Sequence, residues 1–176
     1  MTPPGNRIMR VDAKPPCCLD ALVDGDADGL TQLYIDPRVR AFLGGPLDLA
    51  TAQQRVAALL ADQPNAWVRA VRATAGAPLA GLVMLDPHHD GEDLEISYLL
   101  LPGFWGRGLA TAAVAQMRQD AIQTLGLSRV VAETQAANAA SIRLLERLGF
   151  SEARRVTRFG AEQCIFVSHA ADLHAA

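Results

Sequence analysis

Three short apolar segments occupy the middle of the chain, at 66–72, 79–85 and 94–101. The first alternates apolar and polar residues at a period of two, which is typical of a β-strand, and all three have strand length. Turns at 75–78 and 86–93 separate the three segments. Because such short connections join antiparallel neighbours, we expect an antiparallel meander.

Other segments repeat apolar residues at intervals of three and four, the spacing of one helix face. They predict a helix between Asp48 and Pro64, a second helix over 109–125, and a third helix from Asn138 to Gly149. Each is bounded by a residue that commonly caps or ends a helix.

The helix over 109–125 connects two predicted strands, at 94–101 and 129–134. A helical crossover of this kind makes the two strands run parallel. The segments 151–157 and 162–168 are predicted to form a final hairpin.

The N-terminal part is expected to add a strand at 17–23 and a helix running to about Tyr34, with Asp26 or Asp28 as its cap. A short helical piece is expected at 38–43. These elements precede the meander in the chain.

No internal repeat or linker divides the chain. We expect an N-terminal arm at 1–16, a single domain at 17–170 and a tail at 171–176. The predicted fold class is mixed α/β, with antiparallel N-terminal strands, a parallel central pair and flanking helices.

The composition is globular: half of the 176 residues are hydrophobic and the net charge is −3. Nucleic-acid binders usually have a basic balance, so nucleic acid is not an expected partner. No run approaches the ~18 apolar residues of a membrane span, and the N-terminus has no apolar signal core. We therefore expect a cytoplasmic protein with no membrane partner.

The three cysteines, Cys17, Cys18 and Cys164, are odd in number, and two of them are adjacent in a predicted strand. Adjacent strand residues point to opposite faces. A disulfide framework and a metal site are therefore not expected, and a reducing compartment fits best.

A glycine-rich turn joins the strand at 94–101 to the helix at 109–125, with Gly106 and Gly108 where the helix begins. The first N–H groups of a helix lack intrahelical partners and lie at the positive end of its dipole. This pattern predicts an anion site suited to a pyrophosphate. Glycines that only permit a tight turn would look the same, so the pattern alone does not decide.

The two glycines also match the start of a dinucleotide-binding fingerprint, with Glu133 at the end of the next strand. However, Thr111 stands in place of the third glycine, and the strand before the turn follows two hairpin-joined strands. Too little chain follows for a doubly wound sheet, so this is the weaker interpretation.

Two sequence blocks resemble the GNAT N-acetyltransferases. The segment 105–111, WGRGLAT, is similar to the family's acetyl-CoA pyrophosphate loop. The segment 138–150 is similar to its second block, with Asn, Ser and Leu at three-residue steps before Gly-Phe. The pair most resembles the RimJ/RimL-like branch, which contains ribosomal-protein N-terminal acetyltransferases. The resemblance implies transfer of acetyl from acetyl-CoA to a primary amine by direct attack in a ternary complex.

By this resemblance, backbone groups hold most of the cofactor. The strand end would pair with the pantetheine arm, the glycine turn would cradle the pyrophosphate, and Asn138 would contact the arm near the thioester. Ser141 matches a small helix position close to the thioester. The implied cofactor-binding residues are Leu99, Leu100, Leu101, Trp105, Gly106, Arg107, Gly108, Leu109, Ala110, Thr111 and Asn138.

Two positions depart from the family pattern. A tyrosine often proposed as general acid would fall at Leu145, which cannot donate a proton. The acidic residue that follows the Ala-Thr pair in this branch is Ala112 here. A non-catalytic acyl-CoA-binding or regulatory module therefore stays as the alternative function.

Glu95 is the candidate general base. A lysine-like amine has a pKa of about 10.4 and must lose its proton before it attacks a thioester. Glu95 lies in mid-strand before the expected thioester site, where many GNAT members place a base; the alternative is a solvated carboxylate. Strand N–H groups near Leu100 and Leu101 are expected to stabilise the oxyanion, and Ser141 or water to protonate the thiolate.

Other polar residues are expected to be structural. His88 and His89 are expected in a polar surface turn rather than a metal site, and the three arginines of 154–158 on an exposed strand. The segment 42–46 is expected to line the acceptor site by family analogy alone. The acceptor stays open among a protein N-terminal amine, a small amine or amino acid, and an antibiotic amine, and a homodimer is left open.

Overall fold

The computed structural model describes residues 17–63 and 66–174. This part of the chain forms one seven-stranded sheet in the order β1-β2-β3-β4-β5-β7-β6. The neighbours pair antiparallel except β4 and β5, which run parallel. The mixed sheet confirms the predicted fold class. The strands are β1 (Cys18–Asp20), β2 (Val68–Arg72), β3 (Gly81–Pro87), β4 (Leu94–Leu100), β5 (Arg129–Gln135), β6 (Ser151–Arg158) and β7 (Ala161–His169).

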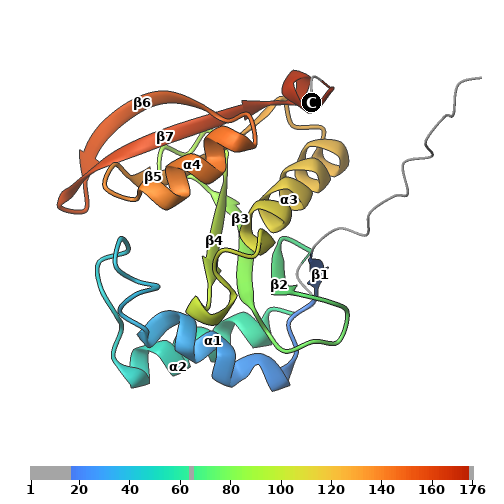
Figure 1. Ribbon diagram of the computed structural model, residues 1–176, viewed down its shortest axis with the longest axis vertical. Coiled ribbons are helices and arrows are strands. Elements are labelled where there is room, and N and C mark those ends of the chain that lie inside the picture. Colours follow the sequence, from blue (N-terminus) through green and yellow to red (C-terminus); the bar gives the residue numbers. More distant parts are fainter. Residues whose placement is uncertain (1–16, 64–65, 175–176) are drawn as a thin grey trace, which may run out of the picture.

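Four α-helices accompany the sheet in the described residues. They are α1 (Ala27–Ile35), α2 (Leu49–Ala61), α3 (Leu109–Leu125) and α4 (Ala139–Arg147). Figure 1 shows α1 and α2 side by side, apart from α3 and α4. None of the described helices has the length and apolar character needed to cross a membrane.

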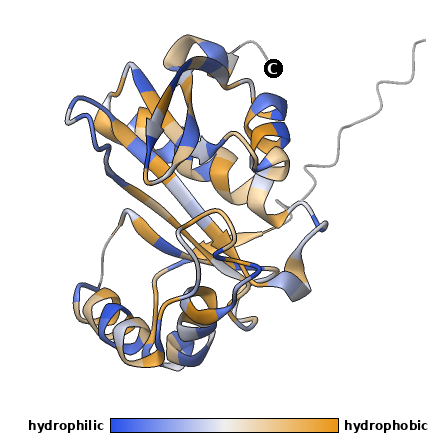
Figure 2. Cartoon of the chain, turned by 90° about the vertical axis from the view of Figure 1, so that its left-hand side faces the viewer, coloured by the Kyte–Doolittle hydropathy of each residue, from blue (hydrophilic) through white to orange (hydrophobic). Residues whose placement is uncertain are grey.

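The helices divide the buried apolar residues into two clusters, one on each side of the sheet. Along β3, Leu82 belongs to the cluster beneath α1 and α2, whereas Val83 belongs to the cluster beneath α3 and α4. Along β4, Leu99 and Leu100 divide in the same way. Figure 2 shows hydrophobic residues, in orange, on the strands of the sheet and on the helices that flank it. This two-sided burial follows from the alternation of side chains along a strand.

The N-terminal predictions need correction. Asp26 stands at the N-cap position of α1, as expected, but its side chain makes no capping hydrogen bond. Its buried carboxylate instead accepts a hydrogen bond from the Val23 N–H (3.0 Å) and forms an ion pair with Arg72 (2.7 Å). The partner is distant in sequence, which a local capping argument could not reveal. The segment 38–43 forms turns rather than helix. The predicted arm at 1–16 lies outside the described residues.

Candidate active site

The candidate site lies where β4 and β5 separate. The two strands pair in register at Glu95 and Val131 only, whereas β4 pairs with β3 along its whole length. Beyond Glu95, the β5 side of β4 therefore has no strand partner in the described part of the chain. A cleft of about 950 Å³ opens there and is lined by residues from both faces of β4. This volume is at the upper end for small-molecule sites.

Leu100, rather than Leu101, presents its backbone to the cleft. The Leu101 N–H donates to the Ala80 carbonyl (2.9 Å), and the Leu101 carbonyl accepts from the Phe104 N–H (2.9 Å). Because backbone groups alternate in direction along an antiparallel strand, those of Leu100 point away from β3. The Trp105 indole donates to the Leu100 carbonyl (2.8 Å). The expectation that the Leu101 N–H serves an oxyanion is therefore wrong.

The glycine turn has the geometry of an anion cradle. Gly106 and Gly108 have φ values of 72° and 77°, in the left-handed region that favours glycine. Gly108 immediately precedes α3, and no side chain caps the helix there. A Cβ at either position would meet no protein atom within 4 Å, so the space beside the backbone is open. The residues present therefore fit a pyrophosphate held by the first amides of α3.

Arginines of α4 line the cleft, whereas the arginine of the glycine turn itself does not. Arg107 lies over the Phe104 ring, 5.5 Å from its centroid, and does not line the cleft. Arg143 and Arg147 of α4 line it instead. A spacing of four residues places both on one face of the helix, a signal that the sequence already contained.

The structure brings most of the predicted cofactor-binding residues together along the cleft. Leu101 and Arg107 are the two exceptions. The residues that line the cleft are Leu99, Leu100, Trp105, Gly106, Gly108, Leu109, Ala110, Thr111 and Asn138.

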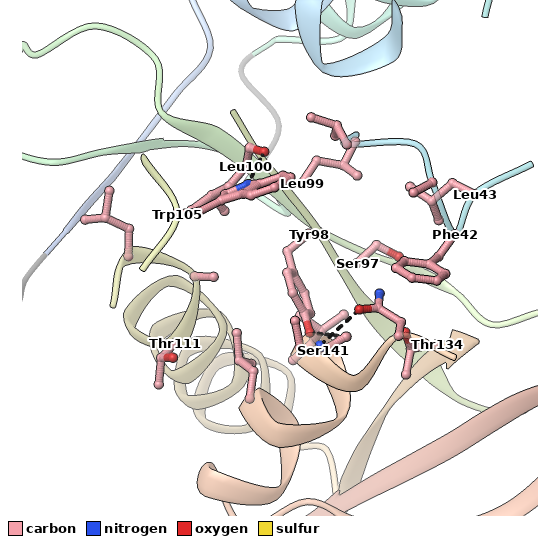
Figure 3. Close-up of a pocket in the computed structure, with 18 of the residues that line it drawn as sticks. Phe42, Leu43, Ser97, Tyr98, Leu99, Leu100, Trp105, Thr111, Thr134 and Ser141 are labelled. Atoms are coloured by element: carbon pink, nitrogen blue, oxygen red, sulfur yellow. Dashed lines mark hydrogen bonds between the residues drawn. The ribbon is translucent and has the colours of Figure 1, made fainter. Parts of the chain in front are cut away.

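Asn138 and Ser141 form the start of α4 at the cleft. The Asn138 side-chain oxygen accepts from the Ser141 N–H (3.2 Å), so the predicted cap is confirmed. The Ser141 hydroxyl lies 2.5 Å from the Tyr98 hydroxyl, and Figure 3 shows the Tyr98 ring directed at Ser141. Leu145, in contrast, is fully buried in the core.

Tyr98 was not identified from the sequence as a functional residue. Burial raises the pKa of Tyr98 above its ordinary value, and the hydrogen bond with Ser141 lowers it in part. The phenol therefore stays protonated near neutral pH. Tyr98 and Glu95 lie on opposite faces of β4, yet both line the cleft because the cleft passes the open edge of the strand.

Glu95 is a largely buried carboxylate rather than a solvated one. Its Oε1 accepts a hydrogen bond from the Glu133 N–H (3.4 Å). Burial raises the pKa of Glu95 above its ordinary value, with the charge of His88 opposing this rise and that of Glu133 adding to it. A carboxyl group with a raised pKa that faces a cleft has the property that a general base needs near neutral pH.

His88 is not on the surface, which corrects the sequence prediction. Its side chain is buried, and its Nε2 lies 3.0 Å from the Glu133 Oε2. Arg158, expected on an exposed strand, donates from Nε to the Glu133 Oε1 (2.7 Å) and from Nη1 to the Asp90 Oδ1 (3.1 Å). These contacts join β3, β5 and β6, which are far apart in sequence.

Arg158 decides whether His88, Glu95 and Glu133 could bind a metal ion. Donor atoms of His88, Glu95 and Glu133 lie within 4.8 Å of one another, as metal ligands would. The guanidinium of Arg158 already lies on Glu133, so the donor set does not fit a second cation there. Burial raises the pKa of Glu133, but the bonds from Arg158 and His88 outweigh it and hold that pKa below its ordinary value. Glu133 therefore stays ionised, and Glu95 is the carboxylate of the pair that can take up a proton.

The opposite wall of the cleft comes from the α1–α2 side. Phe42 and Leu43, in the loop between these helices, line it and face Ser97 in Figure 3. The rest of the expected segment, 44–46, does not line the cleft.

Comparison with known proteins agrees with this architecture. The family model described as acetyltransferase (GNAT) domain matches residues 17–151. An uncharacterized N-acetyltransferase p20 of Bacillus licheniformis is 30% identical over 134 residues, covering 72% of this chain and 74% of that protein.

Two solved structures share the fold. A GNAT-family acetyltransferase from Bacillus anthracis has a TM-score of 0.75 at 15% identity, covering 88% of this chain and 95% of its own. A spermidine N-acetyltransferase from Vibrio cholerae, solved with CoA and spermine, has a TM-score of 0.72 at 16% identity, covering 92% and 99%. The family match and the curated relative show that the chain belongs to the GNAT family of acetyltransferases.

Proposed function

We propose that the chain transfers the acetyl group of acetyl-CoA to a primary amine, with both substrates bound in the cleft between β4 and β5. The observation that carries the proposal is the arrangement of groups along this cleft. An open glycine turn lies at the start of α3, and the largely buried Glu95 lies where β4 and β5 still pair. The solved spermidine N-acetyltransferase, which contains CoA, supports the choice of cofactor.

Each wall of the cleft has a role in this proposal. When bound, acetyl-CoA supplies a thioester whose acyl carbon the amine attacks and whose thiolate leaves. Glu95 accepts a proton from the ammonium group of the acceptor, directly or through water, and so leaves the neutral amine that attacks. The Leu100 N–H, which points away from β3, is placed to donate to a developing oxyanion. The Tyr98 phenol, hydrogen-bonded to Ser141 on the opposite face of β4 from Glu95, donates the proton that the leaving thiolate takes up.

The central test is binding. Acetyl-CoA is expected to bind with one molecule per chain and to raise the unfolding temperature, because a ligand at 100 times its Kd adds about 2.7 kcal/mol of stability. Isothermal calorimetry and thermal unfolding measure the two effects, with NADH as the control ligand. Absence of both heat and shift at millimolar acetyl-CoA would remove the basis of the proposal, and a clear NADH shift would revive the dinucleotide interpretation.

Replacing Tyr98 by phenylalanine is expected to lower kcat about tenfold or more, because it removes the proton donor while keeping the buried ring. The affinity for acetyl-CoA should stay near that of the wild type. Ser141→Ala should have a smaller effect, since the Tyr98 hydroxyl remains. Steady-state kinetics with one good acceptor gives both values; an unchanged kcat in Tyr98→Phe would exclude the phenol as the acid.

The finer assignments belong to the same proposal. The Trp-Gly-x-Gly and Asn-x-x-Ser pattern supports the RimJ/RimL-like branch and a protein N-terminal amine among the candidate acceptors. The three cysteines are free thiols, which supports a cytoplasmic location. The alternative of a non-catalytic acyl-CoA-binding module predicts binding without turnover, and the Glu95 and Tyr98 geometry favours catalysis over it.

A further inference from the structure

Three arginines line the cleft on its α1–α2 side, namely Arg38, Arg40 and Arg55. Arg40 lies in the loop after α1 and Arg55 is on α2. The Arg40 guanidinium donates to the carbonyls of Leu43 (2.6 Å) and Gly45 (2.8 Å), which fixes its position in the loop. Within residues 17–63 and 66–174, neither Arg40 nor Arg55 forms an ion pair with a carboxylate. The neighbouring Arg38, in contrast, is paired with Asp36 at 2.6 Å.

The positive charges of Arg40 and Arg55 affect each other. Burial lowers the pKa of Arg40 below its ordinary value, and the charge of Arg55 lowers it further. Tyr34 also lines this wall, and its hydroxyl lies within the influence of both guanidinium groups. Like charges destabilise each other, so an anion bound between the two guanidinium groups would relieve their repulsion.

The cofactor does not require these arginines. Its pyrophosphate is assigned to the glycine turn at the start of α3, and Arg143 and Arg147 of α4 are further positive charges that line the cleft. The sheet side of the cleft carries carboxylates instead, Glu95 of β4 and Glu133 of β5, and Glu133 is already paired with Arg158. The sheet wall therefore offers the Glu95 carboxylate to the amine, whereas the α1–α2 wall is basic.

We propose that the amine acceptor also carries a carboxylate, which Arg40 and Arg55 bind while the amine faces Glu95. The inference rests on the proposed acetyl transfer and adds the substrate class. Guanidinium groups suit it because they present parallel N–H donors that match the two carboxylate oxygens. The carboxylate can belong to a free amino acid or to an acidic side chain next to a peptide N-terminus.

The test compares matched acceptors that differ only in this charge. One arm pairs β-alanine and γ-aminobutyrate with their amides; the other pairs an Ala-Glu dipeptide amide with an Ala-Gln dipeptide amide. The wild type is expected to favour the carboxylate member of at least one arm by about tenfold in kcat/KM. Which arm shows the preference distinguishes a free amino acid from a peptide N-terminus.

Variants connect the preference to the arginines. In Arg55→Gln the ratio between paired acceptors should fall toward one, because the exposed Arg55 makes no contact that folding needs. Arg69→Gln is the control: Arg69 bonds to the Ala66 carbonyl (2.9 Å) and does not line the cleft, so the ratio should be unchanged.

Each outcome decides a different claim. Equal kcat/KM for charged and neutral acceptors, or a preference that Arg55→Gln leaves intact, overturns the carboxylate inference while acetyl transfer stands. No transfer from acetyl-CoA to any amine of either arm overturns the proposed function, and the inference with it.

Discussion

Replacing Glu95 by glutamine is expected to lower kcat by about 10²-fold or more, the usual contribution of a general base. Glutamine keeps the size of the side chain and can still accept the 3.4 Å hydrogen bond from the Glu133 N–H, but it cannot take up a proton. The affinity for acetyl-CoA should stay near that of the wild type, because the glycine turn lies beyond the opposite end of β4.

The pH dependence of kcat is a second test of Glu95 as the general base. The base form of Glu95 is its carboxylate, and its pKa is raised by burial above the ordinary value of about 4.3. Wild-type kcat should therefore fall as the pH drops through that raised pKa. The Glu95→Gln variant should lack this acid limb and recover in part at high pH, where more of the amine is already neutral.

The measurement is kcat against pH for both proteins with one good acceptor. Glu92→Gln is a suitable control, since Glu92 is an exposed carboxylate in the turn before β4. Equal turnover of Glu95→Gln and wild type near neutral pH would refute the assignment. A loss of acetyl-CoA binding in Glu95→Gln would instead assign Glu95 to the shape of the strand.

Gly108→Val is expected to abolish acetyl-CoA binding in a protein that still folds. The valine side chain would enter the open space beside the backbone, where no protein atom lies within 4 Å of the added Cβ and where the pyrophosphate is assigned. Calorimetry measures the affinity, and circular dichroism measures the fold. Unchanged affinity in a folded Gly108→Val protein would make the turn purely structural.

Gly126→Val provides a matched control for backbone strain. Gly126 ends α3 with φ 64°, and a Cβ there also meets no protein atom within 4 Å. Both valines should cost about 1–3 kcal/mol for a strained backbone. Gly126→Val should nevertheless bind acetyl-CoA normally, because Gly126 does not line the cleft.

Local patterns in the sequence were enough to predict most elements of the fold. The helix over 109–125 agrees with α3, and its place between two strands correctly predicted that β4 and β5 are parallel. The family resemblance was confirmed as well. These features depend on periodicity, caps and chain connectivity, each of which is contained within a few dozen residues.

Two of the errors concern contacts between distant residues. Asp26 with Arg72, and His88 with Glu133, are separated by 46 and 45 positions. From the sequence alone, a turn such as DPHHDGED is expected to face solvent, because its partners lie on strands that come much later in the chain. The roles proposed for Tyr98 and Arg55 were missed for the same reason, because only the folded chain shows which walls meet at the cleft.

The division of the apolar interior into two clusters has an evolutionary consequence. The α1–α2 cluster supports the wall that carries Arg40 and Arg55, while the α3–α4 cluster supports the glycine turn and the start of α4. The shared sheet separates the two, so mutations that remodel one leave the packing of the other intact. A lineage with this architecture can therefore drift toward a new acceptor by changing its first two helices, while purifying selection preserves the cofactor half.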